Sequence, residues 1–207
     1  MVVNLANSKK RAMDDKDKKI VSILYEDGRV SLSKIGEQLD NMSHVAVSKR
    51  LDKLKSDELV KITAAVNVES LDIKVIFLGL ETETIEVADR IIEKYRHCPR
   101  LLMLAPVTGR YNLFAVMVAE DLDSLESMLG TCSMRVEEGI RRSETWFGNA
   151  PVIPQYLPID LDPSRKGFNK EECGCICASC RRHQMKKCVG CPESEVYSGN
   201  LWASKEA

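Results

Sequence analysis

The chain has 207 residues, a net charge of −1, 44% hydrophobic residues and 29% charged residues, values typical of a soluble globular protein. No segment approaches the roughly 18 consecutive apolar residues that a membrane span needs, and the polar N-terminus lacks the apolar core of a signal peptide. We therefore expect a cytoplasmic protein with no membrane partner. Lys and Arg outnumber Asp and Glu in residues 1–62, whereas residues 70–150 are acidic, so the first domain alone suits a polyanion.

Residues 13–56 predict three short helices. Apolar side chains recur at helical spacing from Asp14 to Glu26, and a glycine follows at the end of this segment. Ser31 is a candidate N-cap for a second helix through Leu39, and Ser43 for a third helix through Ser56. The tight turn between the last two helices predicts a helix-turn-helix arrangement.

The third helix is the candidate DNA reader, because its exposed side is basic and rich in hydroxyl groups. The side chains near its N-terminus are placed to enter a major groove, and its cations are placed to contact phosphates. The predicted DNA-binding residues are Ser43, His44, Val45, Ser48, Lys49, Arg50 and Lys53. A solvated basic helix in a protein–protein module is the alternative interpretation.

The next segments predict a wing and then a second domain. Residues 59–62 and 64–68 are expected to form the wing strands, followed by a hinge at residues 69–72. The order then becomes β-α-β-β-α-β, which is ferredoxin-like and makes the fold class α+β. The expected strands are 75–80, 101–106, 111–119 and 142–147, the expected helices are 87–95 and 124–129, and a turn is expected at 108–110.

Five parts follow from this pattern. They are a flexible N-terminus at 1–12, a winged helix-turn-helix at 13–68, a ferredoxin-like domain at 69–150, a proline-rich linker at 151–170 and a cysteine-rich tail at 171–207.

Two strands of the ferredoxin-like domain are apolar at both parities, namely residues 75–78 and 113–118. Two helices cover only one face of a four-stranded antiparallel sheet, so the second face also needs a cover. Each buried Leu or Phe contributes roughly 1.5–3 kcal/mol, which makes a solvated second face costly. The pattern therefore predicts a homodimer; the alternative is that the wing or the tail shields this face.

Six of the eight cysteines lie within residues 173–191. Two C-x-x-C pairs, formed by Cys177 and Cys180 and by Cys188 and Cys191, supply the four thiolates of a tetrahedral zinc site. Cys173, Cys175 and His183 are further candidate ligands. A Cu(I) thiolate cluster, an iron–sulfur cluster and redox sensing through reversible disulfides stay open as alternatives. Cys98 and Cys132 have apolar neighbours and are interpreted as inert core thiols.

The combined pattern resembles the leucine-responsive/asparagine-regulator (Lrp/AsnC) family of transcription regulators. The resemblance rests on MDDKDKKIVSILYEDGR at residues 13–29, on VSKRLDKL at residues 47–54 and on GRYN at residues 109–112 within the ferredoxin-like order. It implies binding to double-stranded DNA as a dimer or a higher assembly such as a tetramer or octamer. It also implies a small-molecule effector bound near Gly109, Tyr111 and Asn112.

Two residues depart from the family pattern. Glu58 occupies the position of the glycine that usually ends the third helix, and Asn112 replaces the usual aspartate of the turn. The second change removes a charge from the expected effector site.

The sequence contains no Ser/His/Asp grouping, phosphate loop or paired-carboxylate motif in a suitable context, so we do not expect an enzyme. The leading hypothesis is a sequence-specific regulator whose DNA affinity responds to an effector, a metal or both. One alternative is a metal-handling protein on a regulator scaffold; another is an interaction module in which the tail recruits partners.

Overall fold

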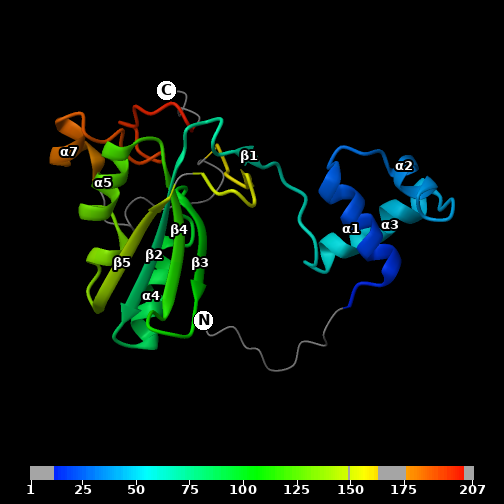
Figure 1. The fold of residues 1–207 in the computed structure, drawn as a ribbon, viewed down its shortest axis with the longest axis horizontal. Helices are drawn as coiled ribbons and strands as arrows, with labels where there is room; N and C mark the ends of the chain where they lie inside the picture. The colour runs from blue at the N-terminus through cyan, green and yellow to red at the C-terminus, as the bar shows by residue number, and fades with distance from the viewer. Residues whose placement is uncertain (1–11, 149, 163–175, 203–207) are drawn as a thin grey trace. The chain divides into compact units, whose positions relative to one another are not determined.

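The computed structural model describes residues 12–148, 150–162 and 176–202. The chain divides between Thr63 and Ala64 into two compact units, each of which is described by itself (Figure 1). In the described part of the chain, no helix is long and apolar enough to cross a membrane.

The first unit consists of α1 (Asp15–Glu26), α2 (Leu32–Glu37) and α3 (His44–Ser56), in agreement with the three predicted helices. Each helix begins at an N-cap whose side-chain oxygen accepts a backbone N–H, and these caps are Asp14, Ser31 and Ser43. Asp14 and Asp17 form a reciprocal capping box. The caps explain why the predicted helix starts are accurate.

A small apolar core holds the three helices together. It consists of Ile20, Ile35, Leu39, Val47 and Leu51, all less than 10% exposed. The turn between α2 and α3 is tight, and a Cβ at position 36 would lie 2.0 Å from the carbonyl oxygen of Met42. Glycine is therefore required at position 36 for the two helices to approach this closely.

The end of α3 explains how the chain tolerates Glu58. Glu58 has a φ of 56°, the left-handed conformation that a glycine usually supplies. Its N–H donates to the Lys55 carbonyl at 3.0 Å, and the N–H of Leu59 donates to the Leu54 carbonyl at 2.9 Å. These two bonds form a Schellman motif, so the backbone turns as it would around glycine.

The prediction of two wing strands is wrong. Residues 59–65 contain no strand, and β1 (Val66–Asn67) pairs with β6 (Tyr156–Leu157) rather than with a neighbouring hairpin strand. Short apolar runs such as 59–62 form strands only where a partner strand is available, and β6 reaches no further than residues 66 and 67.

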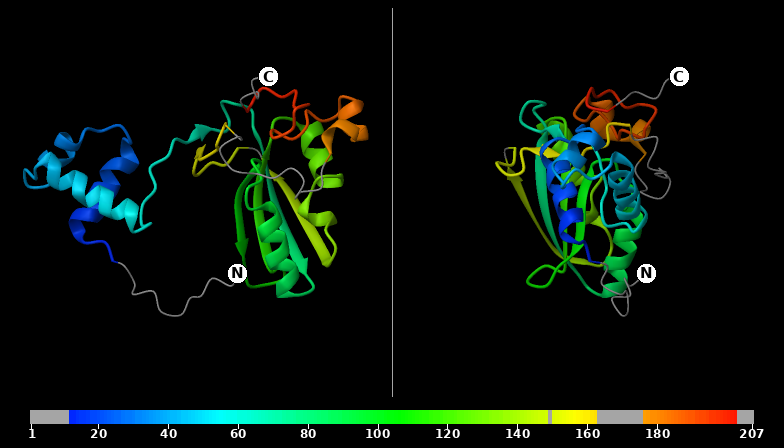
Figure 2. Two further views of the ribbon diagram at one scale, coloured as in Figure 1. Left: turned by 180° about the vertical axis from the view of Figure 1, so that it is seen from behind. Right: turned by 90° about the vertical axis from the view of Figure 1, so that its right-hand side faces the viewer.

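The second unit has the predicted β-α-β-β-α-β order. Its elements are β2 (Lys74–Thr82), α4 (Ile85–Tyr95), β3 (Leu101–Pro106), β4 (Leu113–Ala119), α5 (Leu122–Gly130), the 3-10 turn η1 (Met134–Val136) and β5 (Ile140–Gly148). The antiparallel sheet has the order β3-β4-β2-β5, and α4 and α5 lie on one of its faces (Figure 2). The ferredoxin-like prediction is confirmed.

The face below the helices is a continuous apolar core. Alternate residues of β2 and β4, including Leu78 and Leu113, pack there against Ile91 of α4 and Leu125 of α5. The strong amphipathicity of α4 and α5 follows from this contact, because each helix turns one stripe to the sheet.

The second face of the sheet is partly covered by the chain itself. At one end, Val75 and Val118 pack with Ile159 and Trp202, which lie far along the chain. At the other end, Met103 and Trp146 stay 45% and 40% exposed. Shielding by the tail, the alternative from the sequence, therefore holds for one end of this face and leaves the other end open.

The C-terminal tail folds against the second unit. After β6 the described chain resumes at residue 176 with η3 (Cys177–Ser179) and α7 (Arg181–Gln184). Ser127 of α5 donates to the carbonyl of Lys187 at 2.7 Å, and the N–H of Val189 donates to the Ser124 hydroxyl at 3.3 Å. The tail is thus an integral part of the effector domain.

Candidate functional sites

The predicted DNA-binding residues gather on one exposed side of α3. His44, Val45, Lys49 and Lys53 are exposed, and Val45 is an apolar side chain with 49% of its surface open to solvent. Ser43 is the N-cap and accepts the N–H of Ala46, which orients the first turn. This side of α3 offers two cations, an imidazole and an apolar contact to a ligand in front of it.

Ser48 lies on the same helix but already has a partner. Its hydroxyl donates to the carboxylate of Asp52 at 3.3 Å. An acidic side chain one turn behind the reading residues restricts how closely a polyanion can approach there.

Arg50 has a different role from the one predicted. Its guanidinium donates to Asp14 and to Asp17, each at 2.7 Å, and these two carboxylates raise the pKa of Arg50. Arg50 therefore ties α3 to the N-terminus of α1 and positions the reading helix, while Lys49 and Lys53 remain turned to solvent.

The predicted effector turn lies where β4 meets β2. The Asn112 side chain accepts the N–H of Thr82 at 2.8 Å and donates to the Thr82 carbonyl at 3.1 Å. An aspartate could accept the first bond but could not donate the second. The amide at position 112 is therefore a structural bridge between the turn and the end of β2.

Tyr111 sits in an aromatic and charged environment beside this turn. Its hydroxyl is hydrogen-bonded to Glu144, which raises the pKa of Tyr111, and its ring packs edge-to-face on Trp146 at a centroid distance of 6.1 Å. A Cβ on Gly79 would lie 2.8 Å from the Tyr111 ring, so glycine lets the ring rest on β2. Gly109, with φ of 152°, precedes it in the turn.

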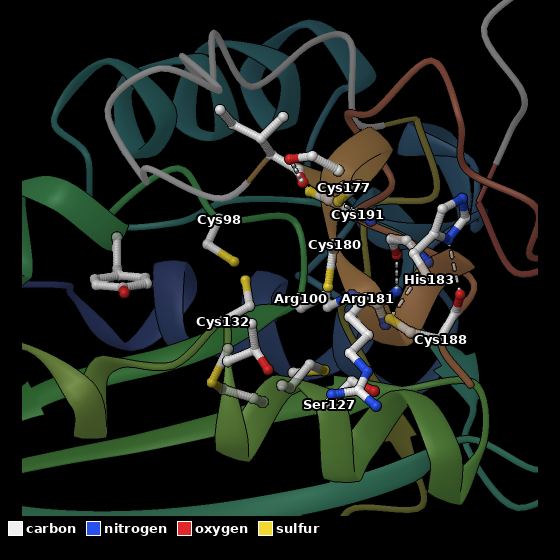
Figure 3. A pocket seen from close by; sticks show the side chains of 17 residues that line it. Cys98, Arg100, Ser127, Cys132, Cys177, Cys180, Arg181, His183, Cys188 and Cys191 are labelled. Atoms are coloured by element: carbon white, nitrogen blue, oxygen red, sulfur yellow. Dashed lines mark hydrogen bonds between the residues drawn. The ribbon is translucent and has the colours of Figure 1, made fainter. Parts of the chain in front are cut away.

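A cavity of about 350 Å³ lies between the tail and the sheet domain (Figure 3). Six cysteines line it: Cys98, Cys132, Cys177, Cys180, Cys188 and Cys191. The first two belong to the sheet domain and were interpreted from sequence as inert core thiols. Their part in this cavity was missed, because no local spacing relates them to the tail.

The zinc site stays a prediction. Among the described residues, no three His, Cys, Asp or Glu side chains are grouped closely enough to hold one ion. Cys173 and Cys175 lie outside the described residues. His183 lines the cavity, and its Nδ1 contacts the carbonyl oxygen of Cys188 at 2.9 Å.

A buried ion pair anchors the tail beside this cavity. Arg100 and Glu120 are each only 6% exposed, and Arg100 also donates to the Gly190 carbonyl at 2.8 Å. Burial would lower the pKa of Arg100, but the Glu120 carboxylate outweighs burial and raises it. Burial raises the pKa of Cys191 to about 12, with the nearby Cys98 acting in the same direction.

Comparison with known proteins bears on the first two parts of the chain. Residues 13–55 match the AsnC-type helix-turn-helix domain. An uncharacterised HTH-type transcriptional regulator of Pyrococcus abyssi is 27% identical over 146 residues, which cover 70% of this chain and 90% of the relative.

Two solved structures share the fold. The structure of E. coli AsnC superposes with a TM-score of 0.58 at 18% identity, covering 67% of this chain and 93% of that protein. A Neisseria meningitidis transcriptional regulator in complex with L-Met gives a TM-score of 0.60 at 19% identity, covering 72% and 97%.

A helix-turn-helix followed by an antiparallel βαββαβ domain defines a class of two-domain, DNA-binding transcription regulators. Within this class, the matched helix-turn-helix and the homologous regulators identify the chain as a transcription regulator of the Lrp/AsnC type. None of these comparisons bears on the cysteine-rich tail.

Proposed function

We propose that the protein binds a two-fold-related DNA site in the cytoplasm as a homodimer, and that it regulates transcription without a catalytic role. The observation that carries the proposal is the exposed, capped N-terminal half of α3 within a matched AsnC-type helix-turn-helix. His44 and Val45 read base edges in the major groove, and Lys49 and Lys53 bind phosphates. Arg50 contributes indirectly by holding α3 on α1.

The open end of the second sheet face supports self-association. Phe77 and Phe114 lie there with ring centroids 6.5 Å apart, beside the exposed Met103 and Trp146. An apolar strip on an antiparallel sheet is covered when a second copy of the same strip packs on it. A dimer formed in this way holds two recognition helices at a fixed separation, as a pseudo-palindromic site requires.

A small-molecule effector is the proposed regulator, acting near the turn of Gly109, Tyr111 and Asn112. The Neisseria relative has been solved with L-Met, which supports an amino acid or a similar small molecule as the ligand class. In this chain the amide of Asn112 is already bonded to Thr82, so Tyr111 and Glu144 offer the polar groups that an effector would contact. Preferential binding to one of two states would then change DNA affinity.

The DNA-binding proposal is tested by measuring binding of a promoter fragment over a series of salt concentrations. We expect Lys49→Ala/Lys53→Ala to weaken binding and to reduce the salt slope by about 2, one per lost phosphate contact. Lys19→Ala, which removes an exposed lysine of α1, is the matched control and should change neither value. Equal affinities and slopes for all three proteins would contradict the proposal.

A further inference from the structure

The described cysteines of this chain all converge on one place. Cys98 follows α4, Cys132 follows α5, and the other four come from the folded tail. Figure 3 shows Cys98 and Cys132 pointing toward one another on the sheet-domain side of the cavity, across from the tail cysteines. Segments separated by up to 93 residues in sequence therefore present soft sulfur ligands to the same space, Cys98 and Cys191 being the outermost pair.

We propose that this cavity is the binding site of an iron–sulfur cluster, held jointly by thiolates of the sheet domain and of the tail. The site is additional to the DNA-binding and effector functions proposed above and does not depend on them. It also differs from a zinc knuckle built by the tail alone, because Cys98 or Cys132 supplies at least one ligand.

The size of the cavity favours a cluster over a single ion. A tetrahedral zinc ion draws four sulfurs to about 2.3 Å and leaves no room around itself, whereas this space is about 350 Å³. No three ligand side chains in the described segments are close enough to share one ion. Several sulfurs spaced around an open volume suit an occupant that has several metal atoms of its own.

The surroundings fit a negatively charged thiolate cluster. Arg100 is a fixed, buried cation whose charge acts on both Cys98 and Cys191, and Arg181 and His183 also line the cavity. Positive charge near the sulfurs stabilises their anionic form. Glu120, which lies close to Arg100, is already paired with it and therefore adds little unbalanced negative charge.

Backbone N–H groups already point at two of the sulfurs. The N–H of Cys191 donates to the Sγ of Cys177 at 3.2 Å, and the N–H of Gly190 donates to the Sγ of Cys188 at 3.4 Å. Such N–H···S bonds spread thiolate charge and tune the reduction potential of iron–sulfur clusters. Met117 and Met128 form part of the wall and limit access of water.

Binding balances as a ligand exchange. Each coordinating thiol releases one proton to the buffer and forms one Fe–S bond, with ferrous iron and sulfide supplied from solution. Because the ligands come from both the tail and the sheet domain, an assembled cluster would also fasten the tail to α5 and to the end of α4.

The test is anaerobic reconstitution of the full-length protein with ferrous iron and inorganic sulfide, with a parallel sample given Zn²⁺ alone. Iron, acid-labile sulfide and zinc are then counted per chain, together with visible absorbance. We expect bound iron and sulfide in about equal numbers and a charge-transfer band. The Cys98→Ser/Cys132→Ser variant should lose the iron, the sulfide and the band.

Ser179→Ala is the matched control, because it changes a polar residue of the cavity wall that is not a thiol. It should retain the full cluster. Circular dichroism and thermal unfolding of each apoprotein show whether the variants fold, so that loss of the cluster is separated from loss of structure. Two results would overturn the proposal: zinc bound with no uptake of iron and sulfide, or undiminished iron in a folded Cys98→Ser/Cys132→Ser variant. Binding to DNA is measured separately and has no effect on either result.

Discussion

The guanidinium of Arg100 and the carboxylate of Glu120 form an ion pair beneath the C-terminal tail, with only 6% of each side chain exposed. The tail is built around this pair. Tyr197 donates to Glu120 at 2.8 Å, and Trp202 stacks on Arg100 at 4.8 Å from its ring centroid. The contacts link the start of β3, the end of β4 and the end of the described chain.

Removal of one partner of this pair should detach the tail. Glu120→Gln leaves the buried Arg100 without its counter-charge, and such a change typically costs about 3–5 kcal/mol. We expect a clear decrease in Tm and faster proteolysis after residue 176. Glu93→Gln is the control, since it breaks the exposed Arg96–Glu93 pair and should cost no more than about 1 kcal/mol. Equal effects of the two variants would show that the buried pair does not anchor the tail.

Glu58 should be replaceable by glycine with a gain in stability. A left-handed φ costs an L-residue roughly 1–2 kcal/mol, and glycine avoids most of that strain. We expect Glu58→Gly to slow amide exchange in α3 about fivefold, which corresponds to about 1 kcal/mol. Glu58→Ala keeps the strain and should show no such slowing. Faster exchange in the glycine variant would contradict the Schellman geometry.

Asn112→Asp, which restores the residue usual in the family, should destabilise the sheet domain at neutral pH. The carboxylate cannot donate to the Thr82 carbonyl, and leaving a partly buried carbonyl unpaired costs about 1–3 kcal/mol. Protonation of the new carboxyl restores a donor, so thermal unfolding should show the deficit shrinking as the pH is lowered. Asn200→Asp, at an exposed site, should change Tm little at any pH. A Tm unchanged by Asn112→Asp would remove the proposed structural role of the amide.

The helix-turn-helix unit should lose stability in acid. The Asp17 N–H and the Arg50 guanidinium hold the pKa of Asp14 below its ordinary value of 3.8. A carboxyl whose folded-state pKa is lowered stabilises the fold above the unfolded-state value and loses this contribution as the pH falls through the folded-state value. Amide exchange in α1 should accelerate below about pH 4, and less so in Asp14→Asn. Glu26→Gln should follow the wild-type profile; an identical profile for Asp14→Asn would argue against the linkage.

Local signals in the sequence were sufficient for the three helices of the first unit. Caps such as Asp14, Ser31 and Ser43 lie within three residues of the groups they bind, so the sequence alone indicates where the helices begin. The βαββαβ order was equally accessible, because strands and helices there differ clearly in periodicity.

Contacts between distant segments were not predictable in this way. The role of Arg50 depends on residues 33 and 36 positions earlier, and the cavity joins Cys98 and Cys132 to the tail. Wing strands were predicted from a short apolar run, but the formation of a strand depends on a partner that sequence periodicity cannot reveal. The coverage of Val75 and Val118 by Trp202 is of the same kind.

The most direct test of the account is selection of bound fragments from the organism's genomic DNA by the full-length protein, followed by sequencing and footprinting. The account predicts an enriched inverted repeat whose half-sites are centred about one helical turn, or a multiple of one turn, apart. Lys49→Ala/Lys53→Ala should lose the protected pattern, and Lys19→Ala should keep it. Recovery of random fragments with no repeat and no protection would contradict the claim that this protein is a dimeric, sequence-specific DNA-binding regulator.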